Sequence, residues 1–156
     1  MEPAKPTLSI CMTCRDSREG ACDTRGGSRL ARRVAEKLAR DSDAQMRLRG
    51  VQCMSQCKRS CIVSLAAEGR FTYVFGELDP DNDIHVDALF ELVSQYLKAP
   101  EGFLERKDRP APLQASVLDR LPPLDPQSPL VSNLSLAETW KMSPRISLFP
   151  EVPTPG

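Results

Sequence analysis

The residues of this chain whose type and spacing could do chemistry are its six cysteines, which all lie within the first 61 of 156 residues. They form a Cys-x2-Cys motif, a single Cys after seven intervening residues and a Cys-x3-Cys-x3-Cys motif, namely Cys11, Cys14, Cys22, Cys53, Cys57 and Cys61. Thiolate sulfur is a soft ligand that favours iron-sulfur clusters, zinc or Cu(I) over magnesium or calcium. Because four thiolates from two adjacent loops can converge on one site, the pattern indicates a metal or redox centre.

Three chemistries are compatible with this spacing. Structural zinc sites use two Cys pairs with two to four residues between their members, and both motifs supply such a pair. A 2Fe-2S cluster needs the same four thiolates, together with backbone N–H groups directed at the sulfurs. Dithiol exchange by Cys11 and Cys14 is the third chemistry, although activating its thiolate needs a helix that begins at the motif. The only histidine, His85, is predicted to be a surface helix residue and no ligand.

The elements that must position these cysteines follow from hydrophobic periodicity. The patterns predict a strand over Thr7–Cys11, a helix over Arg29–Arg40 capped by Ser28, a strand over Met46–Cys53, a hairpin of Cys61–Ala67 and Arg70–Phe75 turning at Glu68–Gly69, and a helix over Ile84–Lys98 capped by Asp83. The order β-α-β-β-β-α predicts an α/β, two-layer fold. Both cysteine motifs fall where a predicted strand gives way to a loop.

The distribution of proline divides the chain. Eleven of the 14 prolines lie from Pro100 onward, which is too dense for long helices or central strands. We therefore expect a domain over residues 1–104, a Pro-containing extension packed on it over 105–125, and a disordered tail over 126–156. Within the extension, Leu113–Leu121 is predicted to form a short helix.

Composition and charge exclude several functions. The 21 Lys and Arg balance 21 Asp and Glu, so there is no excess of positive charge for binding nucleic acid or an anionic membrane surface. No apolar stretch is long enough to span a bilayer, and the first residues lack a signal peptide, so a cytoplasmic protein is expected. The acidic run Glu77, Asp79, Asp81 and Asp83 is predicted to be a solvated loop, and cations near the cysteines, Arg15, Arg18, Lys58 and Arg59, would surround the site with positive charge.

The segments TLSICMTCR, CMSQCKRSC and GRFTYVFGELDP resemble the thioredoxin-like 2Fe-2S ferredoxins and the related respiratory-complex subunit domain. Together with the Ala99–Gly102 step and the segment from Arg109 to Pro122, they also resemble a bacterial family of predicted metal-binding proteins with this ferredoxin-like domain. Members of that family are often associated with cobalt and cobalamin biosynthesis genes. The resemblance covers about residues 7–124 and implies a thioredoxin-like fold.

The resemblance implies Cys11, Cys53 and Cys57 as ligands and favours Cys14 as the fourth, with Cys22 and Cys61 as alternates. It implies a small 2Fe-2S electron carrier or redox or metal sensor. Because the sequence shows no catalytic acid-base pair, no enzyme is expected. The alternatives are a zinc or cobalt carrier linked to cobalamin metabolism and a Cys-x2-Cys thiol oxidoreductase. The partners expected are an unidentified redox protein and a second copy of the chain in a homodimer.

Overall fold

The computed structural model describes residues 4–125 and 127–134. The chain divides into two units, residues 1–126 and 127–156, and the fold described below belongs to the first unit. Most of the predicted disordered tail, residues 126 and 135–156, lies outside the described residues. No helix of the described part is long and apolar enough to cross a membrane.

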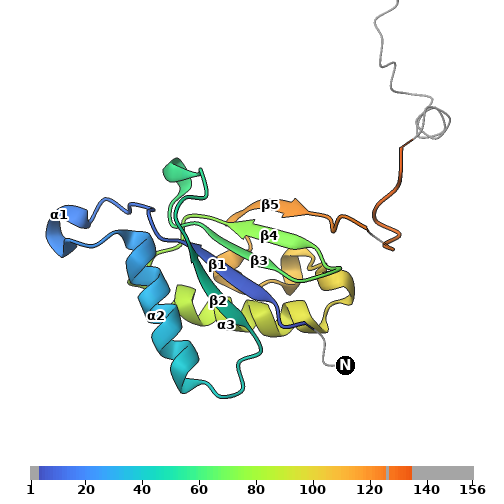
Figure 1. Ribbon diagram of the computed structural model, residues 1–156, viewed down its shortest axis with the longest axis horizontal. Coiled ribbons are helices and arrows are strands. Elements are labelled where there is room, and N and C mark those ends of the chain that lie inside the picture. Colours follow the sequence, from blue (N-terminus) through green and yellow to red (C-terminus); the bar gives the residue numbers. More distant parts are fainter. Residues whose placement is uncertain (1–3, 126, 135–156) are drawn as a thin grey trace, which may run out of the picture. The chain divides into compact units, whose positions relative to one another are not determined.

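The first unit is built on a five-stranded sheet in the order β2-β1-β3-β4-β5 (Figure 1). The strands are β1 (Thr7–Cys11), β2 (Arg47–Val51), β3 (Val63–Ala66), β4 (Thr72–Phe75) and β5 (Val117–Leu121). β1 and β2 are parallel because a helix connects them, whereas the other neighbouring pairs are antiparallel. This topology confirms the predicted α/β, thioredoxin-like fold.

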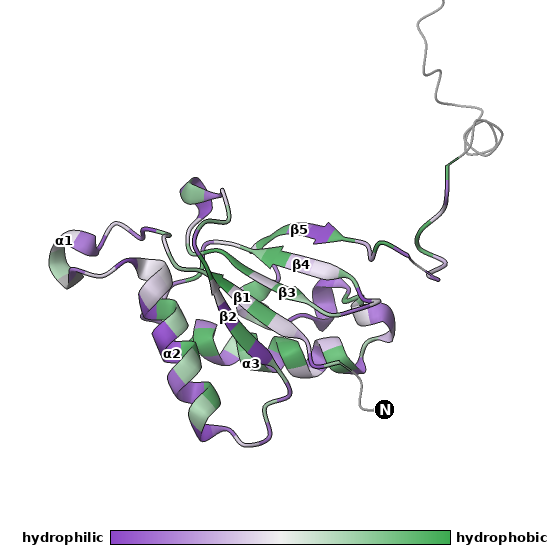
Figure 2. Ribbon diagram, in the orientation of Figure 1, coloured by the Kyte–Doolittle hydropathy of each residue, from purple (hydrophilic) through white to green (hydrophobic). Residues whose placement is uncertain are grey.

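Helices α2 (Gly26–Arg40) and α3 (Asp83–Lys98) pack on one face of the sheet, which confirms two layers (Figure 1). Ion pairs join the two helices, Arg33 to Asp83 and Lys37 Nζ to Asp87 Oδ1 at 2.8 Å. The core lies between the layers, and Figure 2 shows the central strands as mostly hydrophobic. Its fully buried side chains include Leu8, Ile10, Leu30, Val34, Leu65, Tyr73, Leu89 and Leu92. The short helices are α1 (Glu19–Cys22) and the 3-10 turns η1 (Cys57–Arg59), η2 (Pro100–Gly102), η3 (Arg106–Asp108) and η4 (Ala111–Leu113).

Both predicted helix caps are wrong by one to three residues. α2 begins at Gly26, so Ser28 lies inside its first turn, where its Oγ donates to the Met12 carbonyl at 3.0 Å instead of capping the helix. α3 is capped by Asn82, whose Oδ1 accepts from the Ile84 N–H at 2.9 Å, and Asp83 is the first helical residue. Both side chains offered by the sequence were suitable for a cap, but a tertiary contact engages Ser28, and at α3 the cap lies one residue earlier.

The hairpin of β3 and β4 is confirmed, with Gly69 at a φ of 67° in its turn. The helix predicted over Leu113–Leu121 is wrong. Only Ala111–Leu113 forms a 3-10 turn, and Val117–Leu121 is β5, paired antiparallel with β4. As a strand, this segment pairs with the edge of β4, whereas a nine-residue helix on the surface would be only marginally stable. Residues of the extension therefore complete the sheet.

Candidate metal centre

The sheet topology brings two cysteine-bearing loops to one end of the sheet. Cys11 ends β1, and Cys53 lies just beyond β2; because β1 and β2 are parallel, their carboxyl ends lie side by side. Cys61 precedes β3, which is antiparallel to β1, so β3 begins at the same end. We call residues 12–25 the first cysteine loop and residues 52–62 the second cysteine loop.

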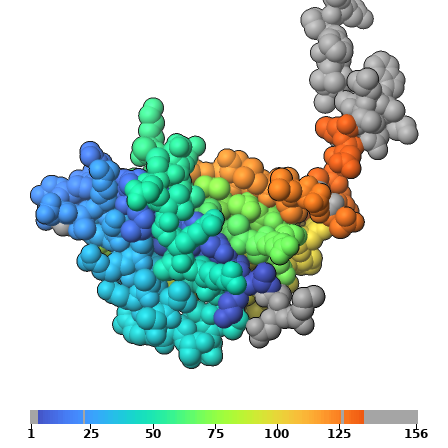
Figure 3. Space-filling view, in the orientation of Figure 1, coloured from blue at the N-terminus to red at the C-terminus, as the bar shows by residue number. Residues whose placement is uncertain are grey.

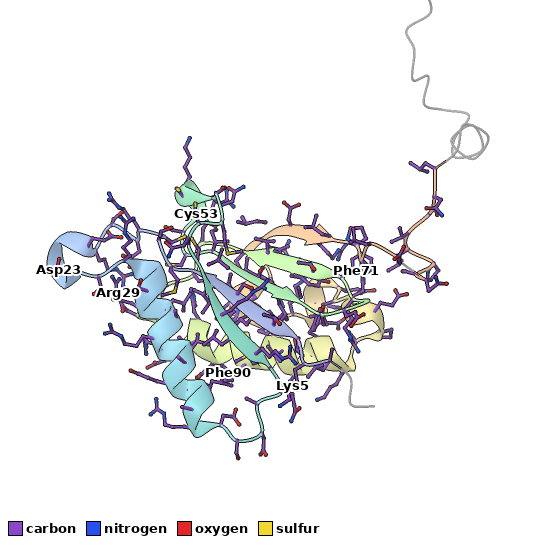
Figure 4. All side chains as sticks on the ribbon, viewed as in Figure 1. Lys5, Asp23, Arg29, Cys53, Phe71 and Phe90 are labelled. Atoms are coloured by element: carbon purple, nitrogen blue, oxygen red, sulfur yellow. The ribbon has the colours of Figure 1, made fainter. Side chains whose placement is uncertain are left out.

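The cysteines at this end of the sheet differ in exposure. Cys11 and Cys14 are 3% and 4% exposed, and Cys61 is fully buried. Cys53 and Cys57 are exposed, and the segment around them stands out from the surface of the domain (Figure 3). Figure 4 places Cys53 in this projecting segment, above the end of the sheet. The site therefore has a buried half and a half that reaches solvent.

Residues at the start of α2 donate hydrogen bonds to the carbonyl groups of the Cys-x2-Cys turn. The carbonyls of Met12, Thr13 and Cys14 accept hydrogen bonds from Ser28 Oγ at 3.0 Å, Arg25 Nη1 at 3.0 Å and Gly27 N at 3.1 Å, respectively. Of the N–H groups of the turn, that of Met12 donates to the Val51 carbonyl at 2.8 Å, and that of Thr13 is directed at the Cys11 sulfur.

Gly27 makes this close approach possible. A Cβ at Gly27 would lie 1.9 Å from the Cys11 carbonyl oxygen and 3.3 Å from the Cβ of Cys14. The sequence alone does not predict this contact of Gly27 with the end of β1. The available signal was the pair itself, because two glycines in a first turn are not explained by capping or propensity.

The pKa values of the two thiols of the Cys-x2-Cys turn are shifted in opposite directions. Burial alone would raise the pKa of the Cys11 thiol, but hydrogen bonds from Cys14 and from the N–H groups of Thr13 and Met54 outweigh it, so this pKa lies below its usual value. Burial raises the pKa of Cys14 to about 11, partly offset by the Ile62 N–H, while negative charge on Cys11 or Cys57 would raise it further. Met54 and Ile62 belong to the second cysteine loop, so the two loops meet at these sulfurs.

The remaining cysteines are placed unequally. Burial raises the pKa of Cys61 to about 12, and charges on nearby Cys14 and Asp16 act in the same direction. The Sγ of Cys53 accepts from the Ser55 N–H at 3.4 Å, at the exposed side of the second cysteine loop. Cys22 belongs to α1, which lies away from the second cysteine loop (Figure 1). The side chain of Cys22 lies outside the described residues.

His85 lies apart from the cysteines. Half-buried in the first turn of α3, it accepts the Asp79 N–H at Nδ1 over 2.9 Å. Within the described residues, no three His, Cys, Asp or Glu side chains lie close enough together to hold one metal ion as they stand.

The donor set fits a thiolate-bound group. Its members are soft sulfur ligands, and backbone N–H groups from both loops already point at the sulfurs of Cys11, Cys14 and Cys53. Such N–H groups stabilise the negative charge of thiolates bound to iron or zinc.

The acidic run is largely exposed, as expected of a solvated loop, and two of the four cations near the cysteines, Arg18 and Arg59, are paired with it. Arg18 contacts Asp79 at 3.0 Å and Asp81 at 2.6 Å, and Arg59 contacts Glu77 at 3.4 Å. The acidic run therefore neutralises cations that the sequence alone left free.

The fold and the site define a two-layer α/β domain with a cysteine-lined end. The chain belongs to the family described as Protein of unknown function (DUF1636), whose family model matches residues 8–123. None of the curated proteins matches it.

Two solved structures are similar to the chain. One is a thioredoxin-like [2Fe-2S] ferredoxin from Aquifex aeolicus, 21% identical, with a TM-score of 0.48 over 77% of this chain and 96% of that chain. The other is a crystal structure of the wild-type thioredoxin-like [2Fe-2S] ferredoxin from the same organism, 18% identical, with a TM-score of 0.45 over 73% of this chain and 96% of that chain.

Proposed function

We propose that this protein binds a 2Fe-2S cluster through Cys11, Cys14, Cys53 and Cys57 and works as an electron carrier or as a redox or metal sensor. The observation that carries the proposal is the direction of backbone N–H groups from both cysteine loops toward the sulfurs of Cys11, Cys14 and Cys53. The protein would be no enzyme in its own right, because the chemistry would be that of the cluster.

The four cysteines would form two pairs of ligands with different exposure. A 2Fe-2S cluster takes two thiolates at each iron and supplies one-electron chemistry when bound. Cys11 and Cys14 would form the buried pair, held rigidly by the first turn of α2, and burial there would exclude water. Cys53 and Cys57 would form the exposed pair, on the side where an electron partner could approach. Cys61, buried close to Cys14, and Cys22 remain the alternates.

The test is purification without air, followed by absorption spectroscopy and analysis of iron and sulfide. We expect visible charge-transfer bands with about two iron and two sulfide per chain. A colourless protein that takes up neither iron nor sulfide on anaerobic reconstitution would refute the cluster.

Zinc or cobalt binding is the second candidate, favoured by the geometry of the Cys-x2-Cys turn. A turn whose carbonyls face away from the sulfurs and whose Thr13 N–H faces the Cys11 sulfur also suits a tetrahedral zinc site. A protein that holds about one zinc per chain and turns green or blue with Co²⁺ would support a metal carrier, such as one linked to cobalamin metabolism.

Dithiol exchange is the third candidate, and the lowered pKa of Cys11 favours it. The burial of Cys11 opposes it, because a disulfide of another protein must reach the attacking sulfur. A Cys14→Ser variant, assayed in metal-free protein beside the metal-free wild type, tests the exchange pair. Thiol-disulfide turnover that persists at the wild-type rate in this variant would exclude the exchange pair.

For the cellular setting, we propose a cytoplasmic protein that exchanges electrons with an unidentified redox protein and forms a homodimer. Sedimentation at several protein concentrations tests the homodimer, and a single species of monomer mass would refute it.

A further inference from the structure

The loop that joins β4 to α3, residues 76–82, contacts both cysteine loops. Backbone hydrogen bonds join it to the second cysteine loop. The Glu77 N–H donates to the Arg59 carbonyl at 2.7 Å, and the Cys61 N–H donates to the Leu78 carbonyl at 3.4 Å. Gly76 allows this approach, since a Cβ there would lie 2.6 Å from the Arg59 carbonyl oxygen.

Ion pairs join the 76–82 loop to the first cysteine loop. Arg18 of the first cysteine loop contacts Asp79 and Asp81. The Asp81 carboxylate also accepts from Arg29 of α2, at 3.4 Å from Nε and 3.2 Å from Nη2. A single short loop therefore contacts the segment that follows Cys14 and the segment between Cys57 and Cys61.

Arg29 connects this loop to Asp16, two residues after Cys14. Its Nη2 is paired with the Asp16 carboxylate, and its Nη1 donates to the Thr24 carbonyl at 2.7 Å. The side chains of Asp16 and Arg29 are only 8% and 11% exposed, so solvent screens this pair weakly. Gly26 leaves room for Asp16, because a Cβ at Gly26 would lie 2.8 Å from the Cβ and Cγ of Asp16.

We propose that residues 76–82 form a bracket that fixes the separation between the two cysteine loops, with Arg29 and Asp81 as its positioning residues. The two loops also touch directly, through Thr13 to Gln52 and Ser60 to Arg15. The bracket adds an anchor to each loop from a third part of the chain. Its consequence for a bound metal rests on the proposed function, whereas its effect on the positions of the cysteines does not.

The test compares Asp81→Asn with the matched control Asp87→Asn. Both carboxylates are exposed and both pair with a cation of α2, but Asp87 pairs with Lys37, away from either cysteine loop. In metal-free protein, we measure iodoacetamide labelling of the peptide that carries Cys11 and Cys14. Labelling should be about tenfold faster in Asp81→Asn, because losing charge-assisted hydrogen bonds favours local opening. The exposed Cys53 and Cys57 serve as an internal reference whose labelling should not change.

Variants at two further positions, Gly26 and Arg29, act on the same contacts without removing Asp81. Gly26→Ala should displace the Asp16 carboxylate and speed labelling, although alanine favours the helix. Arg29→Lys should keep part of the protection that Arg29→Met loses, because lysine retains the charge and loses the planar fork.

The link to metal is tested by loading the wild type and both aspartate variants with Co²⁺ alone and measuring its release to a chelator. We expect release to be about tenfold faster from Asp81→Asn than from Asp87→Asn at matched thermal stability. Equal labelling in the two variants would overturn the bracket. If the wild type binds no Co²⁺ and no cluster, the proposed function fails, and the labelling experiment still decides the bracket.

Discussion

Substituting Gly27 by alanine sets helix propensity against packing. In the first turn of α2, alanine is favoured over glycine by about 1 kcal/mol. However, the new Cβ would lie 1.9 Å from the Cys11 carbonyl oxygen and 3.0 Å from its carbonyl carbon, both backbone atoms at the end of β1. Ordinary contact begins at 3.4 Å, so the helix and the strand must separate by roughly 1.5 Å.

Such a separation destabilises the fold by more than the higher helix propensity of alanine stabilises it. Overpacking typically costs about 1–3 kcal/mol, and losing the hydrogen bond from Gly27 N to the Cys14 carbonyl costs about 1 kcal/mol. The expected net destabilisation is about 1–3 kcal/mol, which lowers the Tm by roughly 4–12 °C. The loss of the carbonyl contact at Cys14 should also reduce metal or cluster content.

The assay is thermal unfolding of metal-free protein, followed by circular dichroism. Gly20→Ala is the matched control, because Gly20 is also helical but has nothing within 4 Å of its Cβ position. Its Tm should be unchanged or higher. A Tm for Gly27→Ala equal to or above that of the wild type would refute the packing argument.

Three other predictions follow from the site and the fold. Cys53→Ser and Cys57→Ser should each abolish cluster binding, and full iron and sulfide content in either variant would contradict the ligand assignment. Hydrogen bonds from Arg18 to Asp79 and from Arg29 to Asp81 lower the pKa of both carboxyls, so the stability they contribute is present above about pH 4 and is lost as the pH falls through the lowered folded-state values. Thermal unfolding of metal-free protein between neutral and acidic pH should show this loss, and Asp81→Asn should reduce it. Removing residues 127–156 should leave both Tm and metal content unchanged, because the sheet and both cysteine loops lie in the first unit; a lower metal content in the truncated protein would assign the tail a role in the site.

The sequence predicted the elements whose patterns are local. β1 was predicted with its observed bounds, and the hairpin of β3 and β4 turns at Gly69 as expected. Alternation and helical periodicity reveal such elements because each depends on residues within one segment. The cysteine spacing likewise determined the kind of donor, since sulfur is soft wherever the chain places it.

β5 could not be predicted in this way. Its pairing depends on the free edge of β4, some forty residues earlier in the chain, and its own residues read equally well as a short helix. The cap of α2 failed for a related reason, because Ser28 found a partner in Met12 of another segment, whereas the cap of α3 is a local bond that lies one residue earlier than predicted, at Asn82.

Only the tertiary structure decided the arrangement of the site. The sequence determined that cysteines, two glycines and an acidic run are present, but not that Gly27 abuts Cys11 or that Asp81 reaches Arg29. It also did not show that Cys11 and Cys14 are buried while Cys53 and Cys57 are exposed. Each of these facts depends on whether segments far apart in the chain contact one another or leave a side chain exposed. Such contacts depend on how the layers pack and which strand ends meet, and no local pattern contains that information.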